Sequence, residues 1–429
     1  MPFYRMAAGH ALAMIRRHMR PAQTIEELSQ FERRGAGTNS ERRASSWLAT
    51  QTDSPSRACN IEPFWCRPNW ALAHAWHVGL ALLGSLLSVN SPRIGGALVL
   101  AALISVVADE LLGISPGRRL TLEHASQNIH AAPTTGPPNT THLIITANYD
   151  AGRTGLCYRR RIRTAAAGLR RAAGGRAPGW LTWLSVTFLW LIAVAILRLE
   201  GSKGAGVGVL QLVPTVVLVL SLALLLELAS ADFSPAANDN ASGTAAALAL
   251  TAALDAAPPR HATVELLLQG ASDGSGLGLR RHLRARRKQL RAHNAIVIGV
   301  GPCAAGQVRW WTSDGALIPL RYLPQLQRLC AQVAADLPEL GAKPHRGRGS
   351  TAALPARAAR IPAIAIGSVS GNGIIAHSHQ RSDTQDHIDQ DAIDDMVQFG
   401  LTLVEHIDAY LAARRATPPS APAYTPAQS

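Results

Sequence analysis

Four long apolar stretches constrain this chain more than any other feature of its sequence. They cover residues 70–89, 94–112, 180–197 and 206–226. Each is about 18–21 residues long, which is close to the length that a helix needs to cross the hydrocarbon core of a bilayer. Trp70, Trp180 and Trp183 lie at segment ends, where interfacial anchors are expected. The sequence therefore predicts two transmembrane hairpins, inserted between more polar segments.

The second stretch allows an alternative interpretation. Residues 94–112 form a short segment that ends in Asp109 and Glu110, so a buried core helix would also fit. In the first stretch, His74 and His77 are predicted to be packing residues and not metal ligands. Four spans return the chain to its starting side, as is required if the segments before, between and after the hairpins assemble into one domain.

Positive charge is concentrated in two blocks, residues 159–176 and 280–291, in a chain with a formal net charge of +14. Neither block interleaves aromatic residues for base stacking, and no zinc-finger or helix-turn-helix pattern occurs, so we expect no nucleic-acid partner. An anionic membrane surface is the simpler partner for these arginines. A solvated helix face is an equally good interpretation of residues 280–291.

The same charges predict an orientation. The arginines of residues 153–176 precede the third span closely, whereas the opposite loops are short and nearly neutral. By the positive-inside rule, the soluble part should face the cytoplasm of a multi-pass protein of the cell membrane. The five cysteines are scattered without a C-x-x-C pair, which favours reduced thiols over a disulfide framework or a structural zinc site.

Outside the apolar stretches, apolar strands of five to seven residues alternate with helical patterns, which predicts an α/β domain. Predicted strands cover residues 142–147, 263–268, 295–301 and 361–366, and helices cover 243–256 and 390–414. Polar residues follow several of these strands, among them Asn148-Tyr149-Asp150 and Ser272-Asp273. Ligands gather at such strand ends in open α/β sheets.

The helix over residues 243–256 is preceded by Asp239-Asn240-Ala241-Ser242-Gly243. This pattern places Asp239 at or near the helix N-cap, where a carboxylate is readily presented to a metal. A plain capping aspartate would be the interpretation if the motif stood alone. It does not, because the strand-end motifs precede and follow it, and His379-Gln-Arg-Ser-Asp383 comes last.

In this order the motifs resemble the zinc-dependent exopeptidase family of bacterial leucyl aminopeptidase and aminopeptidase Y. Glutaminyl cyclase and the transferrin receptor ectodomain are non-peptidase relatives of that family. The resemblance covers roughly residues 24–413, including the runs 31–38 and 44–48, and is interrupted by the apolar hairpins. It implies an α/β fold with a mixed sheet of about eight strands between helix layers, carrying about four inserted transmembrane helices.

The domain organisation follows from the resemblance and the apolar stretches. Six segments are predicted: an N-terminal segment with the start of the peptidase-like domain (1–68), a transmembrane hairpin (69–113), the first sheet segment with a basic loop (114–178), a second hairpin (179–228), the main part of the peptidase-like domain (229–414) and a disordered tail (415–429).

The family site holds two metal ions bridged by a carboxylate, and the resemblance implies that Asp239 is the bridging residue. Asp273 would be a further carboxylate ligand, and His379 would be the last ligand because it precedes Asp383 by four residues. His377 is the alternative if the register differs. Asp150 and Asp383 would support the ligands from a second shell.

Three other positions depart from the family pattern. Asn148 stands where a histidine ligand is usual, and Gly299 is the closest match to an aspartate ligand. Ser272 stands where a glutamate acts as general base, and a serine cannot take up a proton near neutral pH without help. These losses remove the first metal site, whereas Asp239, Asp273 and His379 could still form the second.

Two functions follow. The first is a multi-pass membrane protein whose aminopeptidase-like domain is catalytically impaired and binds a peptide, a protein partner or membrane lipids. The alternative is an active membrane-bound metallopeptidase that uses one remaining metal site. Zinc is the expected cofactor, with at most one ion, or none if the site is fully degenerate.

Overall fold

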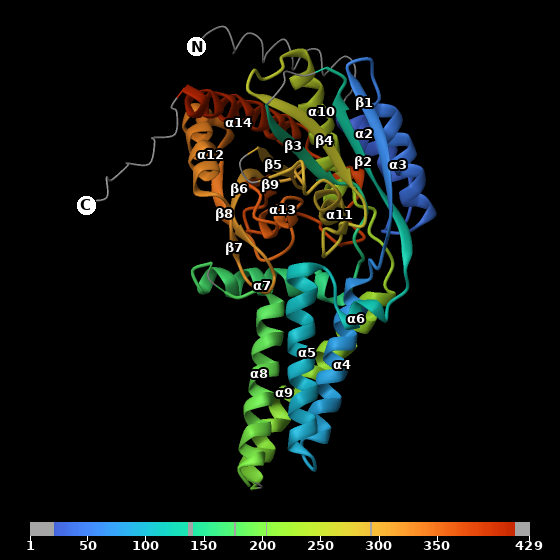
Figure 1. Cartoon of the computed structure of the whole chain (residues 1–429), viewed down its shortest axis with the longest axis vertical. Coiled ribbons are helices and arrows are strands. Elements are labelled where there is room, and N and C mark those ends of the chain that lie inside the picture. The colour runs from blue at the N-terminus through green and yellow to red at the C-terminus, as the bar shows by residue number, and fades with distance from the viewer. Residues whose placement is uncertain (1–20, 136–139, 176, 203, 292–293, 417–429) are drawn as a thin grey trace, which may run out of the picture.

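The computed structural model describes residues 21–135, 140–175, 177–202, 204–291 and 294–416. The predicted disordered tail begins at the end of α14 (Gln390–Ala416), and residues 417–429 lie outside the described residues. Arg176 of the first basic block and Lys203 of the second hairpin loop also lie outside them. A sheet domain sits on one end of a bundle of four long helices (Figure 1).

A mixed sheet of nine strands forms the centre of the upper domain. Its order is β1-β2-β4-β3-β5-β9-β6-β7, and β8 pairs with β6. The parallel centre comprises β4, β3, β5 and β9, and the other pairs are antiparallel except β6 with β8. The strands are β1 (Arg57–Cys66), β2 (His124–Pro133), β3 (Thr141–Asn148), β4 (Ala262–Gln269), β5 (Ala295–Val300), β6 (Gln307–Asp314), β7 (Leu320–Arg321), β8 (Lys343–Arg346) and β9 (Ala363–Val369).

Helices cover both faces of this sheet, which is why the central strands are apolar along their whole length. Every residue of β5 and β9 is buried. One layer contains α2 (Pro21–Gln30), α10 (Gly243–Ala256), α12 (Pro324–Asp336) and α14. In this layer α14 contacts the other three helices, and α10 also contacts α2. The opposite layer contains α11 (Leu277–Ala285) and α13 (Leu354–Ala358), while α3 (Asn39–Thr52) packs on β1 and β2. The predicted mixed sheet between helix layers is confirmed.

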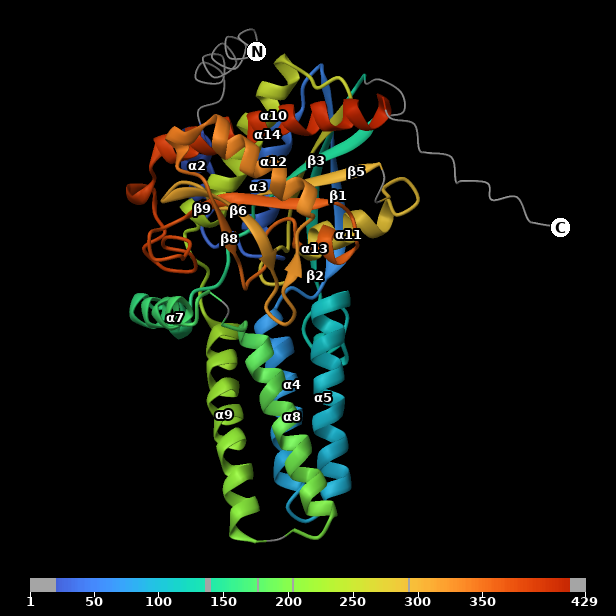
Figure 2. The ribbon, with the colours of Figure 1, turned by 90° about the vertical axis from the view of Figure 1, so that its left-hand side faces the viewer.

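The four apolar stretches form the bundle: α4 (Trp70–Leu87), α5 (Pro92–Leu112), α8 (Trp180–Leu199) and α9 (Ala205–Ser230). All four are long and apolar enough to cross a membrane. They run side by side away from the sheet domain, with both hairpin loops at the far end (Figure 2). The alternative of a buried core helix for residues 94–112 does not fit, because Ile94 and Ile104 are 58% and 60% exposed.

The bundle is fastened to the sheet domain through a buried ion pair. Arg118 in α6 (Pro116–Arg119) donates from Nε and Nη2 to the two carboxylate oxygens of Asp109 in α5, at 2.8 and 2.7 Å. Its other bonds go to Arg67 O and to Ser275 Oγ, which lies in the loop after β4. This one guanidinium therefore joins a membrane-type helix to two segments of the sheet domain.

The second basic block lies at the same junction. Arg280 donates to the carbonyl oxygens of Glu110 and Leu111, and Arg284 donates to that of Leu112. A cation at the C-terminus of a helix satisfies carbonyls that have no partner within the helix and complements the helix dipole. These two side chains therefore cap α5, a role that the charge pattern alone did not indicate.

Candidate metal centre

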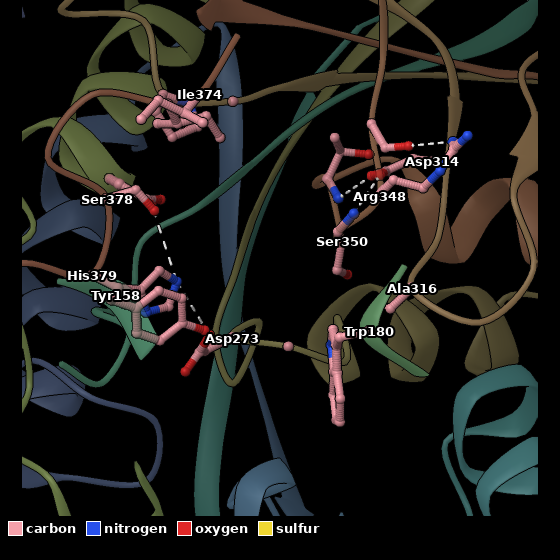
Figure 3. Close-up of a pocket in the computed structure, with 18 of the residues that line it drawn as sticks. Tyr158, Trp180, Asp273, Asp314, Ala316, Arg348, Ser350, Ile374, Ser378 and His379 are labelled. Atoms are coloured by element: carbon pink, nitrogen blue, oxygen red, sulfur yellow. Dashed lines mark hydrogen bonds and ion pairs between the residues drawn. The ribbon is translucent and has the colours of Figure 1, made fainter. Parts of the chain in front are cut away.

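A cavity of about 420 Å³ lies between the sheet domain and the bundle. From the sheet domain it is lined by residues that follow β3, β4, β5 and β6 and by the loop before α14. From the bundle it is lined by Trp70 and His74 of α4, Glu110 of α5, and Trp180 and Leu181 of α8. Figure 3 shows Asp273, His379 and Tyr158 at one end of this space, and Asp314, Arg348 and Ser350 at the other.

Asp239 lines the cavity but is not the helix N-cap that the sequence pattern predicts. It lies within the wide helical turn η2 (Ala237–Ser242), where its own φ and ψ are non-helical, and Ser242 occupies the N-cap position of α10. The turn is wide because Asn238 is fixed from outside, donating from Nδ2 to Ala376 O at 2.9 Å. The carboxylate of Asp383 accepts hydrogen bonds from the backbone N–H of Asn238 and Asp239, at 2.7 and 3.0 Å.

His379 is fixed so that one ring nitrogen faces two carboxylates. Nδ1 lies 2.9 Å from Arg153 O, to which it can donate a proton. Nε2 lies 4.0 Å from Asp239 Oδ2 and 3.8 Å from Asp273 Oδ1. Tyr158 stacks on the imidazole with ring centroids 4.3 Å apart (Figure 3). A Cβ atom at Gly152 would lie 2.2 Å from His379 Cε1, so only glycine leaves room for this ring.

Asp273 is positioned by hydrogen bonds from two sides. Trp70, the first residue of α4, donates from Nε1 to Asp273 Oδ2 at 3.2 Å. Behind the loop, the buried carboxylate of Asp150 accepts the backbone N–H of Ser272 and of Asp273, at 3.0 and 3.2 Å. Asp239, Asp273 and His379 therefore meet at one end of the cavity, as the motif order implies.

The two supporting carboxyls are buried and do not line the cavity. Burial raises the pKa of Asp150 to about 6, against the opposing effect of the Ser272 hydrogen bond. Burial, followed by repulsion from Asp239, raises the pKa of Asp383 to about 7. Both carboxylates accept backbone N–H groups of the loops that carry Asp239 and Asp273, and Asp150 also accepts the hydroxyl of Ser272, so both fix the position of these loops.

Ser272, at the position of the family general base, donates its hydroxyl proton to Asp150. It is 2% exposed. A hydroxyl that already donates to a buried carboxylate is neither a free base nor a nucleophile with a histidine or lysine beside it. This hydrogen bond is a physical reason to expect that Ser272 does not take up a proton from a water molecule.

The two degenerate ligand positions differ in what replaces the ligand. Asn148 lines the cavity, and its Oδ1 is buried without a hydrogen-bond partner in the described part of the chain. Gly299 lies inside β5 and does not line the cavity. A Cβ atom there would lie 2.5 Å from Ala353 N, so the chain before α13 fills the space of the missing aspartate.

Neither His377 nor a second cluster of histidines belongs to this site. His377, the alternative ligand, bonds to Ser382 Oγ and does not line the cavity. Separately, the ligand atoms of His130, Glu265 and His282 lie within 4.8 Å of one another. However, Arg286 Nη1 donates to Glu265 and lies 3.3 Å from Nε2 of both histidines, so a guanidinium already supplies the cation there.

The sequence did not indicate the residues of α4 and α7 that support the site. Trp70 was predicted as an interfacial anchor, yet it bonds to Asp273. Arg163 in α7 (Arg160–Ala172) donates to Ser378 O and Ile375 O, and so holds the loop that carries His379. No spacing in the sequence indicates these contacts, because each joins segments separated by about 200 positions.

Comparison with known proteins bears on the fold. Residues 227–404 match the sequence model of peptidase family M28. No curated protein sequence matches the chain. Among solved structures, the zinc aminopeptidase BSAP from Bacillus subtilis superposes with a TM-score of 0.51 and 12% identity, covering 90% of this chain and 94% of that one.

Two further structures are similar. Glutaminyl cyclase from Porphyromonas gingivalis gives a TM-score of 0.50 at 14% identity, covering 91% of this chain and 97% of that one. LapA from Legionella pneumophila gives 0.51 at 8% identity, covering 93% and 76%. Together with the sequence match, they confirm the expected resemblance: residues 227–404 resemble peptidase family M28, and the chain has the fold of zinc aminopeptidases and glutaminyl cyclases, joined to four helices that could cross a membrane.

Proposed function

We propose that this chain is a membrane-anchored binding module with an aminopeptidase-like domain, which holds one divalent cation at Asp239, Asp273 and His379 and has lost peptide-bond hydrolysis. One observation carries the proposal. The Nε2 atom of His379 faces both carboxylates while Nδ1 is occupied by a backbone carbonyl.

The donor set suits zinc. One imidazole and two carboxylates are a usual set of protein ligands for a zinc ion that keeps a further position open. A proton held on Nδ1 by Arg153 O leaves the Nε2 lone pair free, which is the arrangement that orients a ligating histidine. Donor atoms around one zinc ion lie about 3.3–3.6 Å apart, so the observed separations of 3.8 and 4.0 Å require only a small closure.

The protein's own residues prepare this site but do not complete a hydrolase. Tyr158 packs on His379, and Trp70 orients Asp273. A bound zinc ion would supply Lewis-acid polarisation of a ligand carbonyl. The proton acceptor is missing, because Ser272 itself donates to Asp150. A positioned general base typically contributes about 10²–10⁴ to a rate, so its loss favours binding over turnover.

Metal analysis of the detergent-purified full-length chain tests the proposal. We expect about one zinc per chain, lost in Asp239→Asn and in His379→Gln. His377→Gln is the matched control, because His377 lies in the same loop outside the cavity. A wild-type protein without metal, or equal loss in the control, contradicts the site. Aminopeptidase turnover that depends on Asp239 would instead support the alternative, an active enzyme with one metal ion.

A further inference from the structure

The end of the cavity opposite the candidate metal centre carries two arginines. Arg170 of α7 and Arg348 of the loop after β8 both line it (Figure 3 labels Arg348). Arg348 uses Nε and Nη1 on the carbonyl oxygens of Ala177 and Gly347, at 2.9 and 2.7 Å. Among the described residues, the side chain of Arg170 forms no hydrogen bond, and neither guanidinium group forms an ion pair with a carboxylate.

Two acidic residues, Asp314 and Glu110, line the cavity on this side, and neither forms an ion pair with Arg170 or Arg348 among the described residues. The carboxylate of Asp314 accepts the backbone N–H groups of Gly349 and Thr351, each at 2.8 Å. Burial and then the neighbouring Arg348 lower the pKa of Arg170, whereas Asp314 raises it. Two partly desolvated guanidinium groups that form no ion pair with a described carboxylate can bind a phosphate or carboxylate group.

The sheet domain adds His345 and Ser350 to this end of the cavity, and the apolar wall comes from α7 and α8. Trp180 and Leu181 begin α8, and Ile162, Ala166 and Ala167 come from α7. In Figure 1, α7 runs roughly perpendicular to the bundle helices at the level of their upper ends, and Figure 2 shows it to one side of the bundle, beyond α9. That is the position expected for an amphipathic helix at the headgroup level of a membrane crossed by the four helices. Its exposed Leu169 and its arginines fit this environment.

We propose that this end of the cavity binds an anionic membrane phospholipid, with its phosphate between Arg170 and Arg348 and its acyl chains against Trp180 and Leu181. The site is separate from the cation ligands and does not depend on a bound metal. It gives the cavity a ligand that enters sideways from the lipid layer, between α7 and α8, in addition to any ligand that comes from water.

The test titrates the detergent-purified full-length chain with phosphatidylglycerol or phosphatidylcholine and measures bound lipid by native mass spectrometry. We expect phosphatidylglycerol to bind better, and Arg170→Gln to weaken its binding about tenfold or more. The side chain of Arg170 makes no hydrogen bond to the described residues, so the substitution should leave the fold intact. Arg348→Gln should act in the same direction.

Arg171→Gln is the matched control, since Arg171 is the exposed neighbour of Arg170 in α7 and does not line the cavity. It should change binding less than twofold, and Asp239→Asn should keep phosphatidylglycerol binding even where it removes the metal. Equal binding of both lipids, or equal loss in Arg171→Gln, would overturn the proposal. Competition by inorganic phosphate at lipid-like concentrations would also overturn it, because it would reveal a site for soluble anions.

Discussion

At the scale of single residues, the candidate metal centre depends on groups that hold the ligands from behind. Asp383 fixes the backbone at Asp239, and Asp150 fixes the backbone at Asp273. The carbonyl of Arg153 fixes the ring of His379. Such supporting bonds keep ligand geometry within the narrow limits that metal binding needs. They surround the three positions, Asp239, Asp273 and His379, at which we propose a cation site.

The two lost ligand positions should respond differently to restoration. Gly299→Asp places a Cβ atom 2.5 Å from Ala353 N, so the substitution should destabilise the domain by about 1–3 kcal/mol. Asn148→His adds an imidazole on the cavity wall and should cost much less. Thermal unfolding in detergent measures both. A fully stable Gly299→Asp protein that binds a second zinc ion would show that the chain before α13 moves aside.

At the scale of elements, α6 carries one of the connections between the bundle and the sheet domain. Arg118 is buried and pairs with the buried Asp109, while its neighbour Arg119 is exposed. The same guanidinium bonds to Ser275, two residues beyond Asp273. Removal of the Arg118 side chain should therefore change the position of the loop after β4, which carries Asp273.

Arg118→Ala should lower the stability of the protein by about 3–5 kcal/mol, because it leaves Asp109 buried without its counter-ion. It should also weaken zinc binding at Asp273. Arg119→Ala, in the same short helix, should do neither. Adding Asp109→Asn to Arg118→Ala should recover part of the stability, since the unpaired charge is then gone. Equal unfolding temperatures for the two single variants would argue against this junction.

Much at the element scale could be predicted from the sequence. The lengths of the apolar stretches gave the four bundle helices, and the uninterrupted apolar strands gave a sheet covered on both faces. The order of the motifs brought Asp239, Asp273 and His379 together. The sequence predicted Asp239 at or near the helix N-cap. In the structure Ser242 occupies the N-cap position, and Asp239 lies earlier, in a turn where Asn238 bonds to Ala376, far along the chain. Local patterns carry no information on such contacts, and the same limit applies to Trp70 and Arg163.

At the scale of the whole molecule, the structure joins a degenerate peptidase-like site to a membrane-type bundle with one cavity between them. Trp70 is part of both, since it begins α4 and bonds to Asp273. Because the cavity walls come from both halves, displacement of the bundle would change the site. The hairpins therefore complete one wall of the cavity.

The orientation of the molecule in a membrane can be tested as a whole. The sheet-domain side carries the arginines of α7, whereas the described residues at the far end of the bundle carry Arg93, Arg198 and Glu200 as charges. The positive-inside rule then predicts a cytoplasmic sheet domain. Trypsin should cut at the exposed Arg287 and Lys288 in inside-out membrane vesicles and leave them intact in sealed right-side-out vesicles. Detergent should abolish the protection. Cleavage at this turn in sealed right-side-out vesicles would place the domain, and with it the cavity mouth, on the opposite side of the membrane.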